Sequence, residues 1–361
     1  MNSPHRSLSF DDAPSFSDDN YRAALQFMLS DRLIHLARHG WAPDDLRHVA
    51  GPTIDPHLRS VLRQVTAVAP DRIRTAWQRQ CRPPSLRRRP LAPVSELEPL
   101  LEAVDGLPCL SGTDDLTDLA CLQAAGADTL TPEQRRARHR ITGLLKKAES
   151  TTFAEEAETL IAKAQQLRQR YRIDSLDGDD TAPGAVVTVR IHLTAPWVRF
   201  QHLLLANIAV ANSCRAILST EVGIAALVGH PDDVQHTAEL FASLNRQRDH
   251  FMRHSPGAAA AAHRGETAAY RRSFLQSYAY RIGDLLTEAT SSTETSPEEQ
   301  ARALPVLAKR SVIAEEAFAR IFPHTATLSM SHRFHAPGAT DGIRAAERSH
   351  LGPERTAVGG A

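Results

Sequence analysis

The segment "VVTVRIHL" (186–193) decides the fold class, because apolar and polar residues alternate along it. This period of two predicts a half-buried β-strand. One side of the extended chain would carry four apolar residues: Val187, Val189, Ile191 and Leu193. Long helical patterns precede and follow the strand, so we expect an α+β protein that is predominantly helical.

The residues after this strand predict a domain that continues with helix, strand, strand and helix. Two segments have apolar residues at helical spacing, and two short apolar runs between them surround a turn. We expect these elements to form an α+β C-terminal domain over residues 185–323, with a short antiparallel sheet covered by helices. The four segments are "WVRFQHLLLANIAVAN" (197–212), "CRAILST" (214–220), "GIAALVG" (223–229) and "DDVQHTAELFASLNRQRDHFM" (232–252).

The end of the chain has weaker patterns. "SPGAAAAAHRGE" (255–266) is interpreted as a loop, because Pro256 and Gly257 interrupt the preceding helix, although its alanines could extend the next one. The last predicted helix ends before Pro323. Residues 324–361 have no clear periodicity and are expected to be a weakly ordered tail.

Upstream of the strand, the patterns are helical. Residues 1–20 are polar and acidic, and we expect a disordered tail there. Residues 21–81 predict a helical N-terminal region whose first helix ends at Gly40. Residues 82–130 begin with "RPPSLRRRPLAP" (82–93), which holds four prolines and four arginines. This composition favours an extended, solvated linker, followed by short helices.

The most regular helical pattern is "ITGLLKKAESTTFAEEAETLIAKAQQLRQRYRI" (141–173). Each half has an apolar stripe at helical spacing, and Thr131 and Thr152 are suited to be the N-cap residues of two helices. Only about three residues join the halves, so the two helices are expected to lie antiparallel. Residues 131–174 are therefore predicted to form a helical hairpin.

The hairpin motifs "LLKKAES" (144–150) and "EEAETLIAKAQQLRQRYRID" (155–174) resemble the bacterial and phage domain of unknown function 2786 family. The turn "TTF" (151–153) departs from the polar or proline-containing link of that family. "HGWAPDDLRHV" (39–49) is similar to a Gly-Trp-x-Pro segment of its actinobacterial members. Three segments look like the companion C-terminal domain: "WVRFQHLLLANIAVANSCRA" (197–216), "LVGHPDDVQHTAELFASL" (227–244) and "YRRSFLQSYAYRI" (270–282). The resemblance implies no reaction, ligand or catalytic residue.

Composition limits the classes of function. The 361 residues are 42% apolar, and 42 Lys and Arg balance 42 Asp and Glu, so the overall charge favours neither nucleic acid nor membrane. No apolar run is long enough to cross a bilayer, and the polar first residues lack the apolar core of a signal peptide, so we expect a cytoplasmic protein with no membrane partner. The cysteines are scattered and expected to be reduced: Cys81, Cys109, Cys121 and Cys214.

Local charge is uneven, and residues 71–90 carry seven arginines against Asp71, a net charge of +6. Several guanidinium groups close together can bind phosphates, while Trp77 could stack on bases or pack inward. Two other interpretations explain the same charges: the arginines only keep the linker solvated, or the linker binds the acidic N-terminal tail. The candidate nucleic-acid-binding residues are Arg72, Arg74, Arg79, Arg82, Arg87, Arg88 and Arg89.

Other chemical motifs are weak. His250 and His254 have a spacing that suits a metal, but arginines surround them, and "HRFH" (332–335) has no rigid pattern, so no metal is expected. "LARHGWAPDDLRHVAG" (36–51) has the spacing of a helix-turn-helix, yet its second helix begins with two aspartates where bases would be read. No nucleophile elbow or phosphate loop occurs, and no catalytic residue or cofactor is predicted.

These patterns favour a non-enzymatic, cytoplasmic interaction protein whose partner is nucleic acid or an acidic protein. An enzyme with an active site in the C-terminal α+β domain is the alternative, and the reaction is unknown. The sequence leaves the oligomeric state open.

Overall fold

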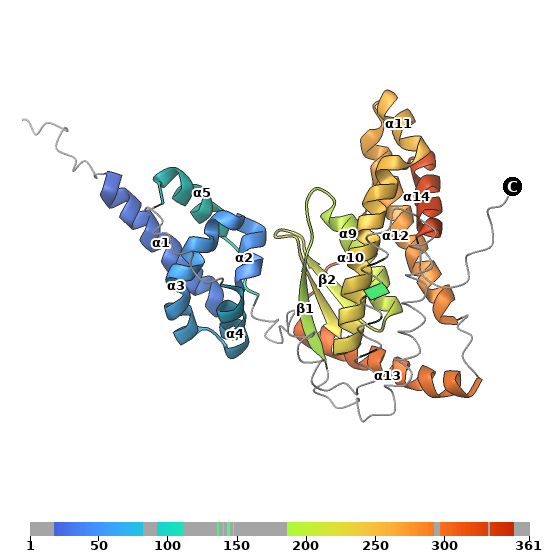
Figure 1. Cartoon of the computed structure of the whole chain (residues 1–361), viewed down its shortest axis with the longest axis horizontal. Helices are drawn as coiled ribbons and strands as arrows, with labels where there is room; N and C mark the ends of the chain where they lie inside the picture. Colours follow the sequence, from blue (N-terminus) through green and yellow to red (C-terminus); the bar gives the residue numbers. More distant parts are fainter. Residues whose placement is uncertain are drawn as a thin grey trace, which may run out of the picture. The chain divides into compact units, whose positions relative to one another are not determined.

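The structure is a computed structural model of the chain (Figure 1). It describes residues 18–81, 92–110, 186–291, 297–330 and 333–349, together with the helical residues Arg136, Arg140, Gly143, Leu144 and Lys147. Of 289–291 and 297–307 it describes the backbone alone. The chain divides into two compact units, Met1–Asp114 and Asp115–Ala361. The rest of the predicted hairpin at 131–174 lies outside the described residues.

The described part of the first unit is helical. Its helix α1 ends before Gly40, whose φ of 91° lets the chain leave the helix in a left-handed conformation. The core consists mainly of leucines, valines and isoleucines from these helices, packed around the buried rings of Trp41 and Trp77. The elements are α1 (Asp18–Arg38), α2 (Pro43–Ala50), the 3-10 helix η1 (Pro52–Ile54), α3 (Asp55–Val68), α4 (Asp71–Gln80) and α5 (Val94–Val104).

The second unit contains a three-stranded antiparallel sheet in the order β1-β3-β2. In the register, Leu227 of β3 lies opposite Val189 of β1 and Ala216 of β2, and Val187 and Ile191 pack on the same apolar cluster. The alternation in "VVTVRIHL" is therefore confirmed as a strand with one apolar face. The strands and the helix between them are β1 (Val187–His192), α9 (Val198–Ala211), β2 (Arg215–Ser219) and β3 (Ile224–Gly229).

Helices cover this sheet, and β3 is buried along its whole length. The helix α10 follows β3 and packs on α9 and on the sheet, whereas α12 packs between α9 and α14 (Figure 1). The expected fold class, a predominantly helical α+β protein with a short antiparallel sheet, is confirmed. The helices that follow the sheet are α10 (Pro231–His254), α11 (Pro256–His263), α12 (Thr267–Ser291), α13 (Pro297–Ile321) and α14 (Ala336–Arg348).

Two of these helices were not predicted from the sequence. The expected loop at 255–266 contains α11, in which Pro256 occupies the first turn and five alanines supply strong helix propensity. Within 324–361, where no periodicity predicted an element, Ala336–Arg348 forms α14. No helix among the described residues is both long enough and apolar enough to cross a membrane.

Small residues explain why α14 packs so tightly against α12. A Cβ atom on Gly338 would lie 2.5 Å from the backbone carbonyl oxygen of Tyr270, and one on Gly342 would collide with the carbonyl oxygen of Phe274. The two glycines are four residues apart and therefore on one side of the helix. The side of α14 that packs on α12 therefore carries glycines where side chains would not fit. A pattern of large apolar residues does not reveal such a side.

Candidate nucleic-acid interface

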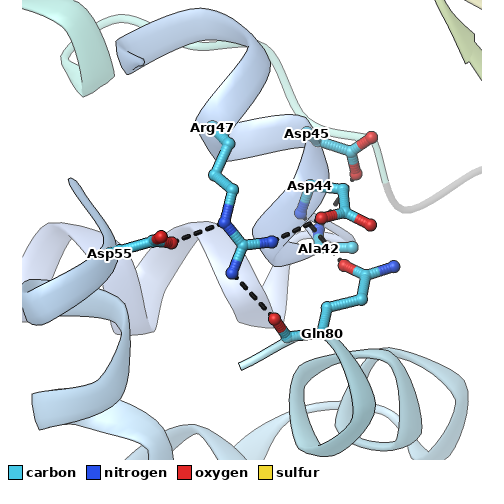
Figure 2. Close-up of polar contacts among 6 residues, drawn as sticks. All are labelled: Ala42, Asp44, Asp45, Arg47, Asp55 and Gln80. Carbon is cyan, nitrogen blue, oxygen red and sulfur yellow. Dashed lines mark hydrogen bonds and ion pairs between the residues drawn. The ribbon is translucent and has the colours of Figure 1, made fainter. Parts of the chain in front are cut away.

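The predicted arginine-rich segment begins on α4, and Arg47 of α2 fixes the C-terminal end of that helix (Figure 2). The Arg47 guanidinium pairs with the carboxylates of Asp44 and Asp55 and donates from Nη2 to the backbone oxygen of Gln80 at 2.7 Å. Burial lowers the pKa of Arg47, but its hydrogen bonds and charge contacts with the two aspartates outweigh that effect and raise it. Arg47 is therefore a charged link between α2, the start of α3 and the end of α4.

The acidic start of α2 is used within the first unit. Asp45 accepts a hydrogen bond from the backbone nitrogen of Ala42 at 3.0 Å, and the backbone nitrogen of Asp44 donates to the Gln80 side chain at 3.0 Å (Figure 2). Pro43 and Asp45 are buried. A DNA-reading helix contacts base edges with its N-terminal residues. The residues in that position on α2 are occupied by internal contacts, so the helix-turn-helix alternative has no support here.

The described arginines of the predicted site lie on α4. Arg72 and Arg79 are exposed, whereas Arg74 is half-buried, pairs with Asp71 at 3.1 Å and donates to the backbone oxygen of Ala69 at 3.2 Å. Arg74 is thus partly committed to closing the turn between α3 and α4. The remaining candidates lie outside the described residues: Arg82, Arg87, Arg88 and Arg89.

Trp77 is fully buried, and its indole Nε1 donates to the backbone oxygen of Trp41 at 2.8 Å. Of the two alternatives left open by the sequence, stacking on bases or packing inward, the structure selects packing inward. Any base contact at this end must therefore come from residues other than Trp77.

The arginines of α3 lie outside the arginine-rich segment of the sequence. Arg63 is exposed and Arg59 is half-buried on α3, which packs against α4. Across residues 55–80 the chain carries five arginines and two aspartates, a net charge of +3. The α3 arginines precede the window of highest charge, so only helix packing brings them to the same end of the unit.

The opposite end of the first unit is acidic. Residues 92–110 contain four carboxylates and neither Lys nor Arg. Their helix α5 packs on α1 and α2, and in Figure 1 it lies at the far end of this unit from α4. The net charge of the chain therefore hides a charge separation within the unit.

Thiol chemistry has no support at the end of α4. Cys81 is free and buried, and burial raises the pKa of its thiol to about 11. A thiol with such a pKa stays protonated and a poor nucleophile at neutral pH.

The histidine pair on α10 is exposed and helical, as its spacing predicted. The rings of His250 and His254 stack with centroids 4.3 Å apart, and Nδ1 of His254 donates to the backbone oxygen of His250 at 2.8 Å. In the part of the chain that the structure describes, no group of three or more His, Cys, Asp or Glu side chains is placed to hold a metal ion.

Ser273 and His335 are brought together in the second unit, but not as a nucleophile and its base. The Ser273 hydroxyl accepts from the backbone nitrogen of His335 at 2.9 Å. The imidazole Nδ1 accepts from the backbone nitrogen of Gly338 at 3.1 Å, and Nε2 faces Glu266 at 3.4 Å. Both ring nitrogens are thus engaged in capping α14 and contacting Glu266, which leaves none to take a proton from the serine.

Comparison with known families gives one match. Residues 136–175 match the model of a family described as "Protein of unknown function (DUF2786)". No curated protein and no solved structure matches the chain. The match covers most of the predicted hairpin and supports a domain of this family at these residues.

Proposed function

We propose that this chain is a cytoplasmic interaction protein that associates with nucleic acid through a basic end of its first unit. The basic end comprises α3, α4 and residues 81–90. One observation carries the proposal: Arg47 anchors the end of α4, from which the chain continues directly into Arg82 and the arginines at 87–89. We also propose that the family resemblance extends beyond the matched residues, to actinobacterial members with a companion C-terminal domain.

Physical chemistry favours phosphates as the ligand of the basic end. Guanidinium groups form two parallel hydrogen bonds with a phosphate, and Arg79 is exposed in the last turn of the anchored helix α4. Because Trp77 is buried, the contacts would be mostly to the backbone, and sequence preference should be slight.

The test is a titration of fluorescent single- and double-stranded DNA and RNA at several salt concentrations. Each phosphate contact should add about −0.9 to the log–log salt slope on duplex and about −0.7 on single strands. Replacing Arg87, Arg88 and Arg89 by Ala should therefore weaken binding to all sequences and reduce the slope by up to about 2.7 on duplex.

A matched pair of variants separates local charge from total charge. Arg72→Ala with Arg79→Ala removes two charges from α4, and Arg22→Ala with Arg38→Ala removes two from α1. Only the first pair should weaken binding. Equal effects of the two pairs would mean that binding depends only on net charge. If the wild type does not bind nucleic acid even at low salt, the proposed partner is an acidic protein instead.

A further inference from the structure

A second basic surface lies in the second unit, which sequence analysis did not identify. It belongs to the arginine bundle, defined as residues 246–281 and 333–349 on α10, α11, α12 and α14. These residues include ten arginines, no lysine and four carboxylates, a net charge of +6. The two stretches lie more than fifty residues apart in the sequence, so no window along the chain contains both.

The four carboxylates of the arginine bundle are already engaged. Asp249 pairs with the buried Arg248 at 2.7 Å, Glu266 with Arg264 at 2.7 Å, and Glu347 with Arg281 at 3.3 Å. The fourth, Asp341, accepts from the Tyr270 hydroxyl at 2.7 Å and from the backbone nitrogen of Gly257 at 2.9 Å. None of these groups neutralises the remaining arginines.

Six arginines of the bundle are exposed and, within the described part of the chain, have neither an ion pair nor a side-chain hydrogen bond. Arg344 and Arg348 are one turn apart on α14 and therefore lie on the same side of it. The six are Arg253 of α10, Arg271 and Arg272 of α12, Arg333 just before α14, and Arg344 and Arg348 of α14.

Helix packing brings together the helices that carry these arginines. The glycine contacts hold α14 against α12, and α14 also packs on α10 and α11. Packed helices have axes about 8–10 Å apart, so side chains on neighbouring helices can reach successive phosphates of one strand. In Figure 1 α11 lies at the end of the second unit opposite α13, and α10 and α12 run from there toward α13.

Exposed aromatic rings accompany the arginines. Phe334 is 70% exposed beside Arg333, and Tyr280 is 50% exposed beside Arg281. The exposed Phe334 ring beside the unpaired guanidinium group of Arg333 suits a ligand that carries both phosphates and flat apolar faces. Unpaired bases supply such faces, whereas duplex bases are hidden by stacking and pairing.

We infer that the arginine bundle is a second nucleic-acid site, which binds single strands by pairing arginines with phosphates and stacking bases on Phe334. This site is independent of the basic end of the first unit. An acidic peptide would satisfy the charges but would gain nothing from the aromatic rings.

The test uses the full chain and a fluorescent single strand of about 16 nucleotides, with the matching duplex as comparison. Arg344→Ala with Arg348→Ala should reduce the single-strand salt slope by up to about 1.4, and Phe334→Ala should weaken single-strand binding about tenfold with little effect on duplex. The matched control is Lys309→Ala with Arg320→Ala, which removes two exposed charges from α13 and should change neither quantity.

Measuring the same variants with Arg87, Arg88 and Arg89 already replaced by Ala separates the two sites. If binding is lost on replacing residues 87–89 and bundle variants have no effect in either background, the second site is wrong and the basic end stands. If only the bundle variants matter, the basic end is wrong instead. Equal displacement of the strand by polyglutamate of the same charge, or no effect of Phe334→Ala, would overturn the assignment to single strands.

Discussion

The indole of Trp77 donates to the backbone oxygen of Trp41 at 2.8 Å, and the indole of Trp41 donates to the backbone oxygen of Pro108 at 2.8 Å. Both rings are fully buried. This chain of two hydrogen bonds joins α4 to the turn between α1 and α2, and that turn to the segment after α5. It fixes the position of α4 within the first unit.

Trp77→Phe should destabilise the first unit by about 1–3 kcal/mol, because it removes the donor to the Trp41 oxygen and leaves a smaller ring in the same space. Urea unfolding measures the effect. Gln78→Ala is the control, since Gln78 is the next residue on α4 and is exposed. Unchanged stability of the Trp77 variant would contradict its place in the core.

Arg47→Met should destabilise the protein by about 1–3 kcal/mol, because Asp55, Asp44 and the Gln80 carbonyl lose their shared partner. Arg22→Met is the matched control. Arg22 also pairs with an aspartate three residues before it, Asp19, at 2.6 Å, but that pair is on the surface. A surface pair contributes about 0–1 kcal/mol, so equal losses in the two variants would show that Arg47 is not a structural link.

The strands were predictable because their signal is local. The alternation of apolar and polar residues predicts an apolar face that carries Val187, Val189 and Ile191. The register with β3 confirms this face. The helix α14 was not predictable by the same logic, since Gly338 and Gly342 define its packed side by the absence of side chains. The close approach depends on the backbone of α12, and the local sequence of α14 contains no information about that backbone.

Gly342→Ala should destabilise the second unit by about 1–3 kcal/mol, although alanine is the better helix former, because the new Cβ would collide with the Phe274 carbonyl oxygen. Thr340→Ala is the control on the exposed side of α14 and should be neutral or slightly stabilising. Thermal unfolding compares the two. If Gly342→Ala is as stable as the control, α14 does not pack on α12 as described.

The residues of the candidate sites also differ in whether a local stretch of sequence reveals them or only tertiary packing does. The charge of residues 71–90 is visible in one window of sequence, so Arg72 and Arg79 are candidates from the sequence alone. Arg63 on α3, and the arginines of α12 and α14, join basic surfaces only through tertiary packing. The sequence leaves the role of Trp77 open, because an aromatic residue among arginines is compatible with both a core and a stacking site. The burial of Trp77 decides for the core.

His202 on α9 provides a test by pH. Burial lowers the pKa of its imidazole from 6.5 to about 4, and its Nδ1 is buried with no hydrogen-bond partner among the described residues. Between these two pH values the unfolded chain binds a proton that the folded chain does not. The free energy of unfolding should therefore fall as the pH drops from about 6.5 to about 4, and this contribution should level off below about 4.

The loss attributable to His202 is at most about 3.5 kcal/mol, since the pKa falls from 6.5 to about 4 and each unit of difference corresponds to about 1.4 kcal/mol. Urea unfolding of the wild type and of His202→Gln at several pH values measures it, and the variant should lose less stability on acidification than the wild type does. His250→Gln is the control, because it replaces a histidine that is exposed on α10. Parallel curves for the wild type and His202→Gln would mean that the His202 ring is hydrated in the folded protein and that α9 packs less tightly around it than described.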